Sequence, residues 1–181
     1  MSRRGQTISP EYLAQQKELH LNPTYGLASL GFAPVVKELM ARHDVRSLSD
    51  YGAGKQNLLR GLQKLGATGF DYFPYDPAFP EYGEPKPADL VCCIDVLEHI
   101  EPAFLDAVLQ ELRAITVKRG FFSVNCTPAT KFLPDGRNAH LIQEPVSWWL
   151  PRLREHFEIS QLQELPNGFW VLAEPKGTSG G

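Results

Sequence analysis

The sequence predicts an α/β fold with an open, twisted, mostly parallel sheet and helices on both faces. Short apolar runs of strand length alternate with helical apolar patterns over residues 45–172, which is typical of parallel strands joined by helices. One run, residues 90–94, is apolar at every position, as expected for a strand covered on both faces. A glycine turn, Gly52 to Gly54, lies between the first strand and the helix after it. Together these observations predict a Rossmann-like sheet.

Two helices are expected ahead of the sheet. Ser9 followed by Pro10 is a typical helix start and predicts a helix over residues 10–20. A second helix is expected to begin at Pro34. Because both segments precede the glycine turn, residues 1–44 are predicted to form a helical lid over whatever the turn binds.

The α/β core is expected over residues 45–174, followed by a flexible tail at 175–181, within a single domain of residues 1–181. Residues 77–88 are rich in proline, glycine and charge and cannot hold a regular helix, so the sheet is expected to be shortened there. The direction of the last strand stays open. The core elements are expected in this order: a strand over 47–51, a helix carrying Leu58, Leu59 and Leu62, strands over 69–75 and 90–94, a helix opened by Pro102, a strand over 120–125, a helix opened by Pro145, and strands near 157–160 and 169–172.

Composition and charge exclude several classes of protein. Hydrophobic residues make up 43% of the chain and charged residues 22%, which are ordinary values for a globular domain. The formal net charge of −3 provides no basic field that would hold nucleic acid non-specifically. The three cysteines have no CxxC spacing, which argues against a disulfide scaffold or a structural zinc site. No apolar stretch approaches the roughly 18 residues of a membrane span, so we expect a soluble, cytoplasmic protein with no membrane partner; its oligomeric state stays open.

Polar residues fall at the expected carboxyl ends of four strands, where open α/β sheets bind their ligands. An acidic residue about 20 positions beyond a glycine turn can bind the hydroxyl pair of a ribose. Asp76 follows Gly54 by 22 positions and is preferred over Asp71, which would fall inside its strand. The residues at these strand ends are Asp50 with Gly52 and Gly54, then Asp76, then Asp95 with Glu98 and His99, and finally Asn125 with Thr127.

At these positions the sequence resembles the class I S-adenosylmethionine-dependent methyltransferases. Residues 48–54 are similar to their first motif, residues 75–77 to their acidic second motif, and residues 89–100 to their fourth motif with its trailing Leu-Glu-His. The resemblance covers about residues 45–172 and implies an enzyme that methylates an oxygen or nitrogen of a small-molecule acceptor. Two departures stand out: Gln56 replaces the third glycine of the first motif, and residues 77–88 are too short for the family's usual helix and third strand.

The resemblance also implies how the cofactor S-adenosylmethionine would be held. Asp50 and the backbone of Gly52 and Gly54 would bind its methionine end, and Asp76 its ribose. Asp95 would lie at the edge of the cofactor that faces the acceptor.

Aromatic residues are expected near the sulfonium cation of this cofactor. Tyr25 or Tyr51 could supply a π face for it, and the alternative for both is a tyrosine packed in the core. The adenine contacts are expected from residues 77–88 or 95–98.

Asp95, Glu98 and His99 would share one face of a helical turn. Together with His140 from a later loop, they could bind Mg²⁺ or Mn²⁺ through oxygen and nitrogen atoms, with Glu98, His99 and His140 as the candidate metal ligands. The pattern resembles two metal-assisted groups, the ubiquinone-pathway O-methyltransferases and the small-RNA 3′-terminal 2′-O-methyltransferases. Without a metal, Glu98 would cap or form a salt bridge and His99 would pack beside the cofactor.

His140 is also the candidate general base, because an imidazole can take the proton of the acceptor as the methyl group transfers. Asp95, at the acceptor edge, is the second candidate catalytic residue. A metal-assisted RNA 2′-O-methyltransferase stays open, although Lys55, Lys131 and Arg137 are the few basic residues near the site. A catalytically inactive, cofactor-binding partner subunit is a further alternative. A nucleotide-dependent oxidoreductase is disfavoured because GxGxxG is absent.

Overall fold

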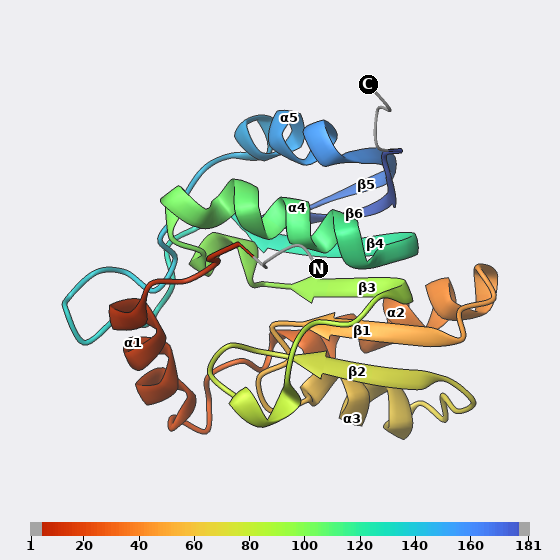
Figure 1. The fold of residues 1–181 in the computed structure, drawn as a ribbon, viewed down its shortest axis with the longest axis horizontal. Coiled ribbons are helices and arrows are strands. Elements are labelled where there is room, and N and C mark those ends of the chain that lie inside the picture. Colours follow the sequence, from red (N-terminus) through yellow and green to blue (C-terminus); the bar gives the residue numbers. More distant parts are fainter. Residues whose placement is uncertain (1–4, 178–181) are drawn as a thin grey trace.

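The fold is built on one sheet of six strands in a computed structural model that describes residues 5–177 (Figure 1). The strand order is β2-β1-β3-β4-β6-β5; the first four strands run parallel, and β6 runs antiparallel to both β4 and β5. This confirms the mostly parallel sheet. Residues 178–181 of the predicted tail lie outside the described residues. The strands are β1 (Ser47–Tyr51), β2 (Asp71–Tyr75), β3 (Ala88–Ile94), β4 (Thr116–Asn125), β5 (Phe157–Leu165) and β6 (Gly168–Pro175).

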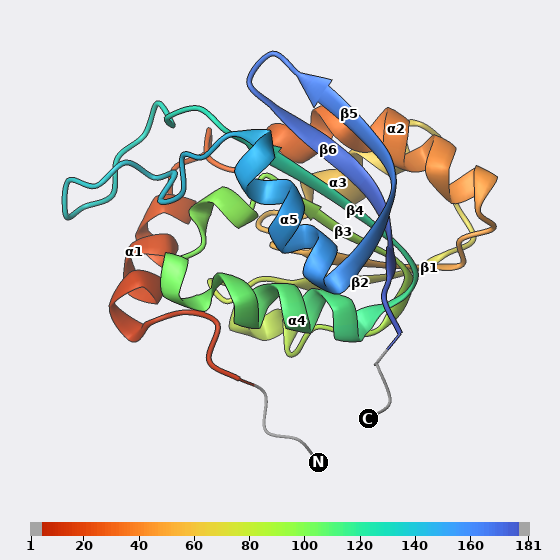
Figure 2. The same cartoon turned by 90° about the horizontal axis from the view of Figure 1, so that it is seen from above.

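Helices cover both faces of the sheet, as predicted: α2 and α3 pack on one face and α4 and α5 on the other, and Figure 2 shows α2 and α4 on opposite sides. Among the described residues, no helix has the length and apolar character needed to cross a lipid bilayer. The helices are α1 (Pro10–His20), α2 (Ala28–Arg42), α3 (Asn57–Lys64), α4 (Leu105–Ile115) and α5 (Val146–His156), with single 3₁₀ turns at η1 (Pro80–Tyr82), η2 (Leu97–His99) and η3 (Pro102–Phe104).

The apolar run in β3 is explained by its central place in the sheet. Leu90 and Cys92 belong to the hydrophobic cluster under α2 and α3, whereas Val91 and Cys93 belong to the cluster under α4 and α5. Successive side chains of a strand point to opposite faces, so both faces of this strand are buried.

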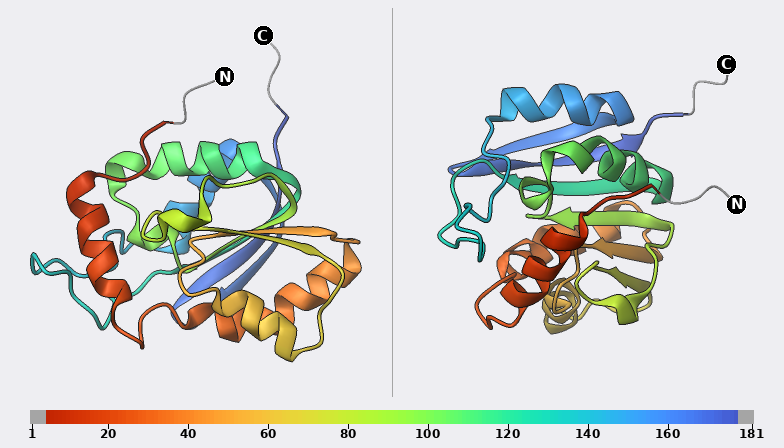
Figure 3. Two further views of the ribbon diagram at one scale, coloured as in Figure 1. Left: turned by 60° about the horizontal axis from the view of Figure 1, so that its bottom comes forward. Right: turned by 60° about the vertical axis from the view of Figure 1, so that its left-hand side comes forward.

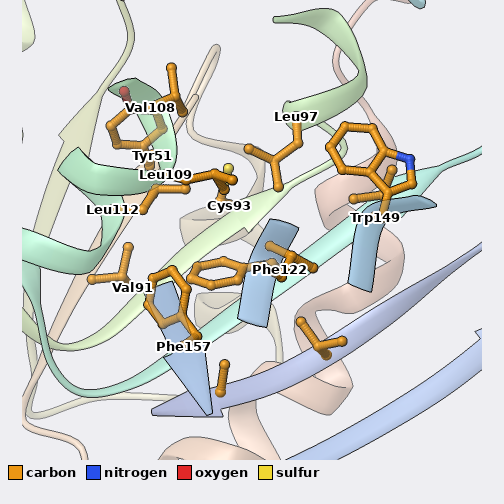
Figure 4. Packing of buried hydrophobic residues seen from close by; sticks show 14 of the residues in the cluster. Tyr51, Val91, Cys93, Leu97, Val108, Leu109, Leu112, Phe122, Trp149 and Phe157 are labelled. Atoms are coloured by element: carbon orange, nitrogen blue, oxygen red, sulfur yellow. The ribbon is translucent and has the colours of Figure 1, made fainter. Parts of the chain in front are cut away.

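The core under α4 and α5 fixes the strands that lead into the site. The rings of Phe122 in β4 and Phe157 meet edge-on with centroids 4.9 Å apart, and Trp149 of α5 is fully buried in the same cluster, near Leu97 (Figure 4). Leu97, at the start of the turn after β3, is buried in the same cluster. Burying these large side chains stabilises the segment that carries the site residues after β3.

Only the first helix of the predicted lid lies over the strand ends. In Figures 1 and 3, α1 crosses the carboxyl ends of the parallel strands. The second helix instead packs against α3 and the sheet through a buried face, and only Ala28 and Ser29 at its start border the pocket described below. Its predicted start was wrong as well: it begins at Ala28, and Pro34 lies inside it. Ala33, in the turn that the prediction left out, is buried where α2 meets Gly61, and an added Cβ at Gly61 would come within 2.7 Å of the Ala33 Cβ.

The sheet is shortened where the sequence predicted. Between β2 and β3 the chain forms only the single turn η1, and β2 is the edge strand. The alternation of strands and helices is therefore interrupted at residues 77–88, and again between β5 and β6, which are joined by a tight turn.

Candidate functional site

A pocket of about 430 Å³ opens at the carboxyl ends of the four parallel strands, beneath α1. This volume lies within the range of about 300–1,000 Å³ that is common for small-molecule and cofactor sites. Residues from separate strand ends border it, so the pocket is shared by the segments that the sequence singled out. The predicted residues among its lining are Tyr25, Asp50, Tyr51, Gly52, Gly54, Asp76, Asp95, His99 and His140.

Hydrogen bonds to the end of β2 hold the glycine turn in place. The backbone N–H groups of Gly52 and Ala53 both donate to the carbonyl oxygen of Tyr75, at 2.8 and 2.9 Å. Gly52 has a φ of 82°, and a Cβ there would lie 2.3 Å from a methyl group of Val96. Only glycine fits this position, because a side chain would be both strained and in collision.

Asp76 closes the turn from the end of β2. Its carboxylate accepts from Gly54 N at 2.9 Å and from Ala78 N at 2.8 Å. Burial raises the pKa of Asp76, while His20 nearby and these two backbone bonds lower it. Asp76 is therefore a buried acceptor at the place where the sequence predicted a ribose-binding carboxylate.

Gln56, at the position of the third motif glycine, has a left-handed backbone of the kind that favours glycine. Its φ of 58° and ψ of 38° lie in the left-handed region, at the residue before α3. For a residue other than glycine this conformation costs about 1–2 kcal/mol. Gln56 therefore holds, at this cost, a conformation that glycine would adopt without strain.

Asp50 lies within β1, one residue before the strand ends, and is 3% exposed. The Tyr72 hydroxyl donates to its Oδ2 at 2.5 Å. Burial raises the pKa of Asp50 to about 7, and the Tyr72 hydrogen bond opposes this rise. A cation beside Asp50 would stabilise its ionised form.

Asp95 follows β3 with an unusual backbone. Its φ is 52°, and its N–H donates to the Ser123 carbonyl at 3.1 Å and to the Ser123 hydroxyl at 3.0 Å. The same hydroxyl donates to Asp95 Oδ1 at 2.7 Å. A left-handed aspartate is uncommon, and such strain gathers at functional sites.

The two tyrosines differ in what they present to the pocket. Tyr51 borders it, but its ring packs in the core cluster and its hydroxyl donates to Glu111 at 2.6 Å (Figure 4). Tyr51 is therefore a tyrosine packed in the core, which was the alternative prediction, and its ring contacts core residues such as Tyr75. Tyr25 faces His99 edge-on at 6.0 Å, and Lys131 Nζ lies 5.5 Å from its ring centroid.

Glu98, His99 and His140 each place a ligand atom within 4.8 Å of the other two. Glu98 Oε1 accepts from Asn125 N at 2.9 Å, while Glu98 Oε2 and His99 Nδ1 are buried without a hydrogen-bond partner. Burial lowers the pKa of His99 to about 3, with His140 adding to the effect, so its imidazole is neutral and can donate a lone pair. These three residues can together hold a divalent cation.

Asp95 does not join this cluster, although the sequence predicted that positions 95, 98 and 99 would converge. The segment after β3 is a single 3₁₀ turn preceded by a left-handed residue, so the α-helical spacing does not apply. Asp95 bonds to Ser123 instead.

His140 is held in one orientation by its loop. Its Nδ1 lies 2.5 Å from the Thr127 carbonyl oxygen, which can only accept, so Nδ1 donates there and Nε2 is the nitrogen that has the lone pair in the neutral ring. Asn138 braces the loop by accepting from both His140 N and Ala129 N at 2.9 Å. A lone pair aimed from a fixed ring is what a general base needs.

The pocket residues missed by the sequence reasoning include three of α1: Tyr12, Gln16 and His20. Tyr12 donates to the His99 carbonyl at 2.5 Å and accepts from Gln16 at 2.7 Å. Their spacing of four residues puts all three on one helix face. That spacing, on a helix already predicted to be a lid, was the signal that could have found them.

The strand order and the pocket define the class, an open α/β domain with a pocket at the carboxyl ends of its parallel strands, where such domains bind their ligands. The particular family follows from its sequence profile: the profile described as methyltransferase domain matches residues 30–170, so the chain belongs to that family. The predicted methyltransferase family is confirmed. No curated protein matches the chain.

Solved structures with the same fold include a 1,6-didemethyltoxoflavin-N1-methyltransferase from Burkholderia thailandensis, with 1,6-didemethyltoxoflavin and S-adenosylhomocysteine bound. It is 16% identical, with a TM-score of 0.66 over 96% of this chain and 93% of that one. An O-methyltransferase family protein from the same organism is 13% identical, with a TM-score of 0.56 over 81% of this chain and 56% of its own. The complex of DhpI with SAH is 12% identical, with a TM-score of 0.54 over 91% and 93%. At these identities the likeness shows the fold.

Proposed function

We propose that this protein is an S-adenosylmethionine-dependent methyltransferase that transfers a methyl group to an oxygen or nitrogen of a small-molecule acceptor. One observation carries the proposal: the buried Asp76 carboxylate at the tip of β2 accepts from Gly54 N at 2.9 Å, inside the pocket. A carboxylate beside a glycine turn is suited to the hydroxyl pair of a ribose. Family membership supports the reaction, and the bound toxoflavin precursor in the Burkholderia thailandensis enzyme supports a small acceptor.

The residues present fit this cofactor. Asp50 and the backbone of Gly52 and Gly54 would hold the methionine end, and Asp76 the ribose. Asp95 would lie at the edge that faces the acceptor. The cofactor supplies an electrophilic methyl group on a sulfonium sulfur, and the protein contributes mainly by placing donor and acceptor together. The single domain would act with α1 as its lid.

His140 is the proposed general base. Its Nε2 has a free lone pair, and the ring lines the pocket beneath α1. It would take the proton that the acceptor loses on methylation.

Isothermal titration calorimetry with S-adenosylhomocysteine and with NAD tests the cofactor assignment. We expect binding of S-adenosylhomocysteine at one site per chain and no heat from NAD, because the site lacks the GxGxxG turn that binds a pyrophosphate. Binding of NAD without binding of S-adenosylhomocysteine would contradict the proposal.

A second candidate is metal-assisted transfer, which would extend the acceptors to the terminal 2′-hydroxyl of RNA. The observation in its favour is the pair of buried, unpartnered atoms Glu98 Oε2 and His99 Nδ1 beside His140. Buried polar atoms usually have partners, and Mg²⁺ or Mn²⁺ would supply one. Such a metal would lower the pKa of an acceptor hydroxyl.

Metal analysis distinguishes methyl transfer with His140 as the general base from metal-assisted transfer. If the site holds a metal, protein purified with Mn²⁺ is expected to retain about one ion per chain, and Glu98→Gln should lose it because a carboxylate ligand is removed. A matched control is His156→Ala, in the exposed cluster of Asp106, Glu155 and His156. Activity that is unchanged by EDTA, in protein without bound metal, would exclude metal assistance.

A further inference from the structure

His20, the last residue of α1, lies inside the pocket against the predicted ribose site. Its Nε2 is 3.9 Å from Asp76 Oδ2, and the two side chains are only 12% and 8% exposed. Tyr25 and Phe79 each contact its ring edge-on, with centroids 5.0 Å away. The imidazole is therefore held in place from two sides and faces the carboxylate.

The glycine turn makes room for this ring. A Cβ on Gly54 would come within 3.3 Å of His20 Cε1, and the Gly54 N–H donates to the same Asp76 oxygen that His20 faces. The imidazole, the bare backbone and the carboxylate thus surround one spot in the pocket.

The separation of 3.9 Å is too long for a direct hydrogen bond between His20 and Asp76. It does allow a hydroxyl oxygen to lie about 2.8 Å from both atoms. A hydroxyl group donates one hydrogen bond and accepts two, so it can donate to Asp76 Oδ2 while it accepts from His20 Nε2–H.

The protonation of His20 suits this role. Burial lowers its pKa, Lys55 lowers it further, and the charge of Asp76 works in the opposite direction. A neutral ring with its proton on Nε2 leaves Nδ1 as a bare acceptor, and Nδ1 is buried without a partner.

We propose that His20 is a cofactor-binding residue that shares one ribose hydroxyl with Asp76. The inference rests on the proposed function, since it takes a ribose as the group bound at Asp76. It goes further by adding a contact from α1, a helix that precedes the 30–170 region matched by the family. The N-terminal end of α1 is already held, because Ser9 N donates to Glu101 at 2.8 Å and the Tyr12 hydroxyl donates to the His99 carbonyl. Cofactor binding at His20 would also hold the C-terminal end of the helix.

The test is calorimetry with S-adenosylhomocysteine and with its 2′-deoxy and 3′-deoxy analogues. His20→Ala is expected to weaken binding of S-adenosylhomocysteine roughly 10-fold, the usual loss for one hydrogen bond of this kind. One of the two deoxy analogues should bind wild type and His20→Ala equally, because it lacks the hydroxyl that the imidazole contacts. His20→Gln should recover part of the affinity, since its amide N–H can replace Nε2–H.

His43→Ala is the matched control, because His43 lies outside the pocket. Thermal melting of each variant confirms that it folds. Unchanged or tighter binding of S-adenosylhomocysteine to His20→Ala would overturn the inference. It would also be overturned if His20→Ala bound both deoxy analogues more weakly than wild type by the same factor. If wild type binds S-adenosylhomocysteine and Asp76→Asn does not, either of these two outcomes for His20→Ala refutes the role of His20 and leaves the proposed function standing. If wild type does not bind it, the proposed function fails as well.

Discussion

Replacing Asp76 by asparagine is expected to weaken binding of S-adenosylhomocysteine by about 100-fold or more. Hydrogen bonds to a charged partner are worth about 1.5–3 kcal/mol each, and a ribose would donate two of them to this carboxylate. The asparagine keeps one oxygen for a backbone N–H but presents a donor where the other oxygen was. Calorimetry measures the affinity, and circular dichroism checks the fold.

Asp71→Asn is the matched control for this substitution. Asp71 is the other acidic residue at a suitable distance from the glycine turn, but it is exposed at the start of β2, at the opposite end of the strand from the pocket. We expect it to bind S-adenosylhomocysteine like wild type. Wild-type affinity in Asp76→Asn would remove the main support of the proposed function.

The binding should also depend on pH in a defined direction. Burial raises the pKa of Asp76, and only its ionised form accepts both ribose bonds. Affinity is therefore expected to fall as the pH is lowered through that raised pKa, and this dependence should disappear in Asp76→Asn.

The central strands could be predicted from the sequence because burial leaves a direct signature there. Residues 90–94 are apolar at every position since β3 is covered on both faces. The end of β5 carries no such signature. Residues 160–165 are almost all exposed, and their strand is formed by backbone pairing with β6, which no side-chain pattern records.

Among the site residues, too, some positions could be predicted from the sequence and others could not. That Gly52, Gly54 and Asp76 would meet at one pocket could be predicted, because a glycine turn after one strand and an acidic residue after the next fall at the same edge of a parallel sheet. The convergence of Asp95 with Glu98 was wrongly predicted because it assumed α-helical spacing, and the left-handed φ of Asp95 breaks that spacing. Such a conformation depends on the hydrogen bonds that Ser123 supplies from a neighbouring strand, and these are invisible in the local sequence.

Replacing His140 by alanine is expected to lower kcat by between about 100-fold and 10,000-fold, which is the usual contribution of a general base. Affinity for S-adenosylhomocysteine should stay near that of wild type, because the ring contacts His99 and Thr127, whereas the proposed cofactor contacts are Asp50, the glycine turn and Asp76. Single-turnover kinetics measures the chemical step once an acceptor has been identified. The ring makes one hydrogen bond through its side chain, to the Thr127 carbonyl, so the fold should tolerate the loss.

Two comparisons separate the roles that His140 could play. His43→Ala removes a histidine outside the pocket and should leave kcat unchanged. If His140 is a metal ligand, its alanine variant should lose bound Mn²⁺ together with activity, as Glu98→Gln does. If it is a general base without a metal, Glu98→Gln should keep far more activity than His140→Ala. A His140→Ala enzyme with wild-type kcat would exclude both roles. The acceptor's proton would then have to pass to solvent or to Asp95, the carboxylate that Ser123 holds at the pocket edge.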